Sequence, residues 1–394
     1  MPVWNGLDRL LRRSGELAGR RYGLLAHGAS ITEDLRPAHL ALAASEGGAP
    51  SVLFGPEHGS YGVEQDMVPS RDEPDPWTGV PVVSLYGDGE HTLRPRAAAF
   101  DGLDLLLIDL QDVGSRYYTY AATAVWAAEV ALDAGLEVWV LDRPNPLGGT
   151  ITEGAGREPG FESFVSAFDL PVRHGLTLGE IVRLEAKRRA WDGDRLRVWT
   201  VAGWRRTQMW HELGRPWIAP SPNMPSPETA LLYPGACLLE ATTLSEGRGT
   251  TRPFLLFGAP GIDPIRLAEL LEERRFPGSR HLPTYFKPQF QKHAGEVCGG
   301  VEVVITDRRA LRPYRWGLEV LRLVHRNFPQ VFGWRHEPYE FVADRPAIDL
   351  LTGSGECRQA LESGDAPPWQ DWLRGHREYE QSFRQERASI LLYT

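Results

Sequence analysis

The first half of the 394-residue chain alternates short apolar runs with longer amphipathic runs, and this alternation constrains the fold more than any other feature. The apolar runs predict strands at residues 22–27, 51–54, 82–86, 104–110, 137–141 and 196–201. The amphipathic runs predict helices at 37–45, 120–134 and 178–190, the last with a capping box formed by Thr177 and Glu180. Such alternation is typical of an α/β fold in which helices cover a parallel sheet.

The sequence changes in character near residue 220, where the segment SPNMPSPETALLYPG carries four prolines. Proline fixes φ and disfavours helix in the preceding residue, so residues 222–234 are predicted to follow an extended, stiff path between two domains. Further strands and helices follow, with a strand predicted at 300–305 and helices at 265–274, 316–326 and 369–387. We expect a catalytic α/β domain at residues 1–228 and a smaller α+β C-terminal domain at 229–394.

Composition excludes several classes of partner. Lysine and arginine total 43 against 52 aspartates and glutamates, and no basic block interrupts the net charge of −9, so we expect no nucleic acid. No apolar run is long enough to span a bilayer and the amino terminus has no apolar leader, so we expect no membrane insertion and a cytoplasmic location, or secretion if a leader has been removed. Three distant cysteines, Cys237, Cys298 and Cys357, exclude a disulfide scaffold.

Polar residues directly follow three of the predicted strands. One strand runs into Gly55-Pro56-Glu57-His58-Gly59, another into Asp109, Gln111, Asp112 and Arg116, and a third into Asp142-Arg143-Pro144-Asn145-Pro146. Ligand sites in open parallel sheets lie beyond the carboxyl ends of the strands, so these loops are predicted to converge on one site. The usual motifs for ATP, NAD, serine hydrolysis and simple zinc proteases are absent, and we expect no cofactor and no metal.

Glu57 is the first candidate for acid–base chemistry, because a partly desolvated carboxylic acid suits proton donation. Glycoside hydrolysis needs a second carboxylate as base or nucleophile, for which Asp109 and Asp112 are candidates. The structural alternatives are that Glu57 accepts backbone N–H bonds or caps a helix, and that either aspartate only pairs with Arg116 or Arg143.

Arginines and histidines complete the set of candidates. Guanidinium groups favour carboxylate or phosphate, so the loop arginines 116, 143, 173, 248 and 252 are candidates for an anionic substrate group. His27, His58 and His174 are possible metal ligands with Asp109 or Asp142, and a metal-assisted hydrolase using His58, Asp109 and Asp142 is an alternative function. On the main interpretation, His58 supports Glu57 and His174 binds substrate.

Several long motifs resemble one family in the same order along nearly the whole chain. They are LFGPEHG (53–59), IDLQDVGSRYYTY (108–120), VLDRPNPLGG (140–149), RHGLTLGE (173–180), PSPNMPSPETALLYPG (220–235), LSEGRGTTRPF (244–254), CGGVEVVITDR (298–308) and IDLLTGS (348–354). Together they resemble the NamZ-like exo-β-N-acetylmuramidases. The segment Ala26-His27-Gly28-Ala29 departs from the family, whose members tend to carry an asparagine there.

The resemblance implies a Rossmann-like N-terminal domain without a dinucleotide, a smaller C-terminal domain and an active-site cleft between them. It implies release of N-acetylmuramic acid (MurNAc) from the non-reducing end of peptidoglycan fragments such as MurNAc-β-1,4-GlcNAc. The family's glutamate falls on Glu57 as general acid/base.

The sequence therefore predicts an exo-acting glycosidase in which Glu57 protonates the leaving oxygen. Asp109 or Asp112 would support the transition state or activate water, and Arg116, Arg248 or Arg252 would bind the lactyl carboxylate of MurNAc. Further predicted substrate-binding residues are His58, Gln111, Tyr117, Tyr120, Asp142, Arg143, Asn145, Arg173, His174, Asn223, Glu246 and Thr250. A non-catalytic muropeptide-binding protein is the alternative from another class, and the stereochemical course and oligomeric state stay open.

Overall fold

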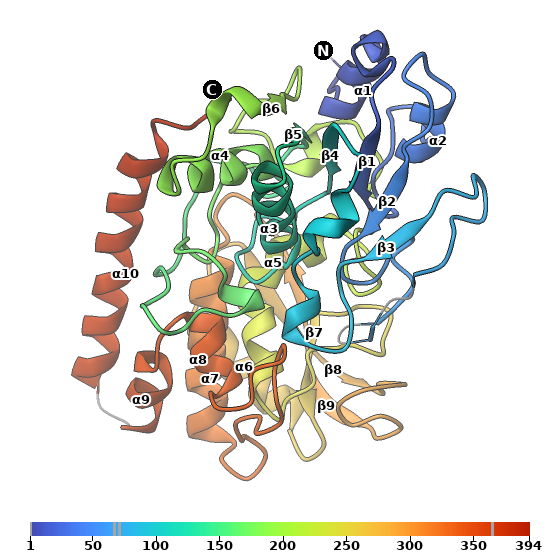
Figure 1. Cartoon of the computed structure of the whole chain (residues 1–394). Coiled ribbons are helices and arrows are strands. Elements are labelled where there is room, and N and C mark those ends of the chain that lie inside the picture. Colours follow the sequence, from blue (N-terminus) through green and yellow to red (C-terminus); the bar gives the residue numbers. More distant parts are fainter. Residues whose placement is uncertain (1, 66–67, 70–71, 364–365) are drawn as a thin grey trace.

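A computed structural model describes residues 2–65, 68–69, 72–363 and 366–394 (Figure 1). All six strands predicted in the first half are present and pair in parallel in one sheet. They are β1 (Tyr22–Ala26), β2 (Val52–Gly55), β3 (Val82–Ser84), β4 (Leu105–Asp109), β5 (Glu137–Leu141) and β6 (Leu196–Trp199). In the strand order β3-β2-β1-β4-β5-β6, β2 and β3 are added on one side of β1, whereas β4, β5 and β6 are added on the other side. Ligands bind in sheets of this type at the point where the order changes side, which here lies between β1 and β4.

Helices cover both faces of this sheet, which confirms the α/β prediction. They are α1 (Gly6–Leu11), α2 (Ala38–Ala43), α3 (Tyr120–Asp133) and α4 (Leu178–Arg188). Along β4, Leu105 and Leu107 join the apolar cluster of α1 and α2, whereas Leu106 and Ile108 join that of α3 and α4. Burial on both faces explains why the β4 sequence is a continuous apolar run rather than an alternating one.

The second half of the chain forms a three-stranded antiparallel sheet with helices, so the smaller α+β part is also confirmed. Its strands are β7 (Leu256–Ala259), β8 (Ser279–Phe286) and β9 (Cys298–Ile305), in the order β7-β9-β8. Its helices are α5 (Pro227–Ala236), α6 (Pro264–Glu273), α7 (Pro313–Asn327), α8 (Ala347–Thr352), α9 (Glu356–Glu362) and α10 (Ala366–Arg387). The predicted boundary at residues 228 and 229 stays a prediction.

Short 3₁₀ helices occupy several connections. They lie at Ser14–Leu17, Glu90–Thr92, Ala97–Phe100, Phe164–Ser166, Gly193–Arg195, Trp210–Glu212 and Cys237–Ala241. Among the described residues, no helix is both long and apolar enough to cross a membrane.

The prediction of an extended path through residues 222–234 was wrong in its second part, because α5 begins at Pro227. Proline fits the first turn of a helix, where its missing N–H has no intrahelical partner to lose. The Ser226 hydroxyl caps the helix by accepting a hydrogen bond from the Thr229 N–H (3.1 Å). Gly235 then allows α5 to approach α7, since a Cβ at this position would lie 1.8 Å from the Pro313 carbonyl oxygen.

The C-terminal end of the chain returns to the first half. Figure 1 shows α10 running alongside the molecule back to the region of α4 and β6. Beyond α10, the Leu392 N–H donates to Glu180 (2.7 Å), and the Tyr393 hydroxyl donates to Asp142. One apolar core extends through both halves and includes Val140 of the parallel sheet and Trp316 of α7.

A buried histidine on α10 lies in surroundings that disfavour its charged form. His376 packs against the rings of Tyr314 and Trp372. Burial, with a smaller effect from the nearby Arg116 and Arg377, lowers the pKa of His376 from 6.5 to about 3. The folded protein therefore holds this histidine neutral, whereas the unfolded chain protonates it below its ordinary pKa.

We expect stability to fall as the pH drops from about 6.5 towards 3, because over that range the unfolded state binds a proton that the folded state does not. His376→Phe keeps the aromatic packing and removes this proton, so its melting temperature should fall less steeply with acid than that of the wild type. His91→Gln, at an exposed position, is the control and should follow the wild type. Parallel curves for His376→Phe and the wild type would contradict the prediction.

Candidate active site

Glu57 lies in a tight turn at the carboxyl end of β2. His58 and Gly59 both have positive φ (70° and 77°), and the Gly59 N–H donates to the Pro56 carbonyl (2.9 Å). Glu57 is 5% exposed. Its Oε2 accepts a hydrogen bond from the hydroxyl of Thr119 at the start of α3 (2.6 Å), whereas Oε1 accepts none from the described residues. One carboxylate oxygen is thus anchored while the other remains available.

A narrow cavity of about 40 Å³ opens beside Glu57 and is lined by both halves of the chain. The first half contributes Glu57, His58, Tyr117, Tyr118, Thr119, Val165, Ser221, Asn223 and Met224, and the second contributes Tyr233, Glu240, Arg248, Phe254, Tyr339 and Glu340. The cavity therefore combines three carboxylates, one guanidinium group and four tyrosines. Paired carboxylates in such a cavity suit acid–base chemistry.

Glu240 is a site residue that the sequence prediction missed. It belongs to the 3₁₀ helix Cys237–Ala241 and is 6% exposed. Its Oε1 accepts a hydrogen bond from Arg248 (2.8 Å), and its Oε2 accepts one from the Tyr339 hydroxyl (2.7 Å). Burial, followed by the Glu240 charge, raises the pKa of Tyr339 well above 10, so this hydroxyl stays protonated as a donor. The only signal in the sequence was a lone carboxylate within the apolar run LLEA.

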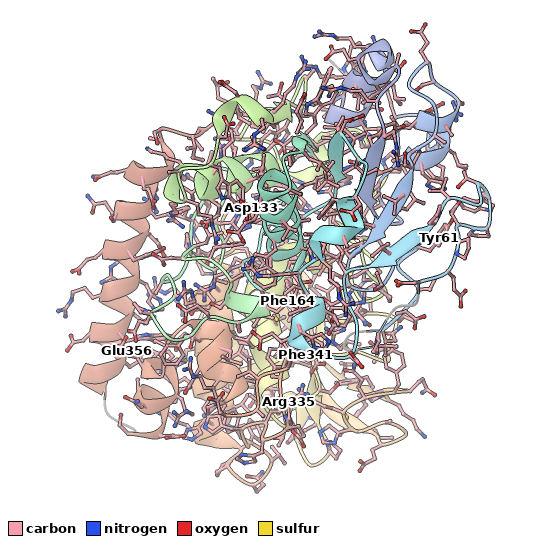
Figure 2. The ribbon with its side chains drawn as sticks, viewed as in Figure 1. Tyr61, Asp133, Phe164, Arg335, Phe341 and Glu356 are labelled. Carbon is pink, nitrogen blue, oxygen red and sulfur yellow. The ribbon has the colours of Figure 1, made fainter. Side chains whose placement is uncertain are left out.

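Glu340 was also missed, and it follows Tyr339 in a strained turn. Glu340 and Phe341 have φ values of 48° and 68°, which are costly for residues with a Cβ. The Tyr86 hydroxyl donates to Glu340 (3.2 Å), and the Tyr86 ring contacts Phe341 and Phe164 (centroids 5.6 and 5.8 Å apart), both labelled in Figure 2. Nothing in the sequence connects this turn with the first half of the chain.

Asp109, predicted as a catalytic candidate, is instead paired with Arg143. The Arg143 Nε and Nη2 atoms donate to its two oxygens (2.6 and 2.8 Å), and both side chains are buried away from the Glu57 cavity. Arg143 also donates to the Ile31 carbonyl (3.0 Å). The structural alternative stated for this aspartate is therefore the arrangement found.

Asp112, Gln111 and His174 also lie outside the cavity lining. Asp112 accepts a hydrogen bond from the Gly114 N–H (2.6 Å) and lies 3.5 Å from Nε2 of His174. The His174 Nδ1 accepts from the Leu176 N–H (3.1 Å), and the Gln111 amide donates to the carbonyls of Asp112 and Pro144. These contacts shape the loops and give no support to direct roles in binding or catalysis.

Asp142 organises the start of α4. Its oxygens accept hydrogen bonds from the Gly179 N–H (2.8 Å) and the Thr177 hydroxyl (2.7 Å), and burial raises the pKa of Asp142 to about 6. The Thr177–Glu180 capping box is present as predicted. Asp142 is accordingly occupied by the fold and does not line the cavity.

The five candidate arginines differ in their partners and in whether they line the Glu57 cavity. Arg116 donates to the carbonyls of Ala155, Leu170 and Leu351 (2.7–2.8 Å) and so joins loops from both halves. Arg143 pairs with Asp109, Arg173 with Glu153 and the half-exposed Arg252 with Glu302. Of the five, Arg248 alone lines the Glu57 cavity.

The other predicted binding residues also differ in whether they line the Glu57 cavity. Three of them line the Glu57 cavity, namely His58, Tyr117 and Asn223, and Glu246 lines a neighbouring pocket. Three make internal hydrogen bonds outside it: Tyr120 to the Pro220 carbonyl (2.7 Å), Asn145 to the Leu176 carbonyl (2.8 Å) and Thr250 to the Gly247 carbonyl (2.6 Å).

His27 hydrogen-bonds to the backbone of two other loops. Its Nε2 accepts a hydrogen bond from the Gln111 N–H (3.0 Å), so Nδ1 carries the proton that faces the Pro220 carbonyl (3.2 Å). Burial, and then the Arg143 charge, lowers the pKa of His27 to about 3, which keeps the ring neutral.

The described residues contain no group of three or more His, Cys, Asp or Glu placed to hold a metal ion.

Comparison with known proteins identifies relatives along the full chain. Sequence models of the exo-β-N-acetylmuramidase NamZ match twice, the N-terminal model at residues 22–228 and the C-terminal model at 231–393. The chain is 37% identical to the peptidoglycan β-N-acetylmuramidase NamZ of Bacillus subtilis strain 168, over 99% of this chain and 91% of that protein.

Two crystal structures of DUF1343 family proteins from Bacteroides fragilis NCTC 9343 are also similar. BF0371 has a TM-score of 0.87 and 30% identity and covers 100% of both chains. BF0379 has a TM-score of 0.75 and 25% identity, with 100% of this chain and 99% of that chain covered. The fold is therefore shared over the entire length.

We predict that Asp109→Asn destabilises the protein, because it leaves the buried Arg143 without an opposite charge. Breaking such a pair costs about 3–5 kcal/mol, which urea denaturation would measure as a lower transition midpoint. Asp101→Asn, at an exposed position, is the control and should change the midpoint little. An Asp109→Asn protein as stable as the wild type would contradict a structural role for this ion pair.

Proposed function

The chain belongs to the NamZ family of exo-β-N-acetylmuramidases, which are glycosidases, and we propose that it releases MurNAc from the non-reducing end of peptidoglycan fragments. The proposed substrate is a glycan end or disaccharide that carries MurNAc linked β-1,4 to GlcNAc. The observation that carries this proposal is the buried Glu57 carboxyl group, anchored on one oxygen in a cavity that both halves of the chain line.

Glu57 is proposed as the general acid/base. Cleavage of the bond to GlcNAc requires a proton on the leaving oxygen, and a buried carboxyl group beside that oxygen can supply it. The Thr119 hydroxyl holds Oε2, and Oε1 is the oxygen that would face the glycosidic oxygen.

Arg248 is proposed to bind the lactyl carboxylate that distinguishes MurNAc from GlcNAc. A guanidinium group can bind a carboxylate through two parallel hydrogen bonds. Arg116 and Arg252, the other two candidates, do not line the cavity, whereas Arg248 lines it and pairs there with Glu240. Of the three arginines predicted to bind the lactyl carboxylate, we therefore retain only Arg248.

The two alternative functions differ in their support. The metal-assisted hydrolase needs His58, Asp109 and Asp142 together, yet Asp109 pairs with Arg143 and Asp142 caps α4. A non-catalytic muropeptide-binding protein would keep the cavity without turnover, and only an activity measurement separates it from the enzyme.

We expect Glu57→Gln to lower kcat on MurNAc-GlcNAc by roughly 10²–10⁴-fold, the usual contribution of a positioned general acid. Release of free MurNAc, measured by chromatography, reports the reaction. Glu64→Gln is a control from the same loop and should retain activity. A folded Glu57→Gln protein with wild-type turnover would rule out the role of Glu57. Binding of the disaccharide without any turnover by the wild type would favour the non-catalytic alternative.

Exo action has its own test on longer glycans capped by MurNAc at the non-reducing end. The enzyme should release one MurNAc from that end and then stop at the exposed GlcNAc. Mass spectrometry of the products over time would detect this. Internal cleavage products appearing early would contradict exo action.

Charge recognition is tested by the ratio of kcat/KM for aryl β-MurNAc to that for aryl β-GlcNAc. The wild type should favour MurNAc, and Arg248→Gln should reduce that preference roughly 10- to 100-fold, as expected for one hydrogen bond to a charged group. The ratio cancels any general loss of activity common to both substrates. An unchanged ratio would show that another group binds the lactyl carboxylate.

A further inference from the structure

Glu240 lies where two cavities meet. The narrow cavity beside Glu57 and a neighbouring pocket of about 580 Å³ share Glu240 and Arg248 in their linings. The larger pocket continues past Trp334 and Arg335, the latter labelled in Figure 2. Its volume is within the range of pockets that bind small ligands, so it can hold a sugar residue. A saccharide that extends from this pocket towards Glu57 would pass Glu240.

Hydrolysis of a glycosidic bond uses two carboxyl groups, one beside the leaving oxygen and one beside the anomeric carbon. Asp109 and Asp112, predicted from the sequence for the second role, do not line the cavity of Glu57. Glu240 and Glu340 do. The second carboxylate is therefore to be sought in the C-terminal half of the chain.

Glu240 fits this role better than Glu340 for two reasons. First, it borders the larger pocket as well as the narrow cavity, whereas Glu340 lines only the narrow one. Second, the Arg248 guanidinium group and the Tyr339 hydroxyl hold its two oxygens in place, and both donors favour the ionised carboxylate. A fixed carboxylate costs little reorganisation when positive charge develops next to it.

We propose that Glu240 is the second catalytic carboxylate and acts at the anomeric carbon opposite Glu57. This inference rests on the proposed function. Glu57 gives its proton to the leaving GlcNAc oxygen as the bond from that oxygen to C1 breaks, with the electron pair going to the oxygen. The Glu240 carboxylate stabilises the positive charge at C1. A water oxygen then adds to C1, and the proton it releases goes to Glu240 or Glu57, depending on the face attacked.

The two roles predict different responses to the leaving group. A dinitrophenyl leaving group needs no proton, so Glu57→Ala should regain much of its lost activity on dinitrophenyl β-MurNAc relative to MurNAc-GlcNAc. Glu240→Ala should lose at least about 10²-fold on both substrates, because the charge at C1 develops in each. Added azide should restore Glu240→Ala on the dinitrophenyl substrate and give MurNAc azide, since the small anion attacks C1 where the carboxylate is missing.

Glu356→Ala, at an exposed position on α9, is the control and should keep activity without responding to azide. Glu340→Ala, from the same cavity, tests the competing assignment and should not respond to azide. Glu240→Gln keeps the size of the side chain and serves if the alanine protein does not fold; it should lose turnover on both substrates. Glu240→Ala with near wild-type turnover, no restoration by azide, or azide restoration in Glu340→Ala instead would each overturn the proposal. A wild type inactive on every MurNAc glycoside would instead refute the proposed function itself.

Discussion

Burial of polar side chains at the carboxyl edge of the parallel sheet is the constraint on which the rest of the structure depends. A buried charge is costly unless it is paired and hydrogen-bonded. Asp109 is therefore matched by Arg143, Asp142 by the first turn of α4, and Arg116 by three backbone carbonyls. These satisfied groups fix the loops, so that the one oxygen of Glu57 without a described partner has a defined position.

The same requirement joins the two halves of the chain into one site. Arg116 reaches the Leu351 carbonyl, and Tyr86 donates a hydrogen bond to Glu340. The cavity beside Glu57 consequently contains carboxylates from both halves, and Glu240 lies within its shared lining. Acid–base chemistry at a glycosidic bond then depends on how the C-terminal half packs against the N-terminal half, because the proposed second carboxylate belongs to the C-terminal half.

Local patterns predicted much of the fold and the position of Glu57. The run at β4 is apolar because both sheet faces are buried, and Thr177 with Glu180 marked the start of α4. The sequence analysis did not predict strand β8, because apolar side chains at its exposed positions, such as Leu282 and Tyr285, break the alternating pattern. The prediction of an extended path through the proline-rich segment failed from Pro227 onward, because proline can start a helix as readily as it continues an extended path.

By itself, the sequence determined the parallel sheet, the three polar loops at its carboxyl edge and the family, since periodicity and local motifs are properties of neighbouring residues. Tertiary structure alone decided which polar residues face the cavity. Asp109 and Glu240 are both acidic side chains, but Asp109 pairs with a residue 34 positions away, and Glu240 is brought to Glu57 by the packing of the second half. Such pairings depend on long-range geometry, which no local pattern of residues encodes.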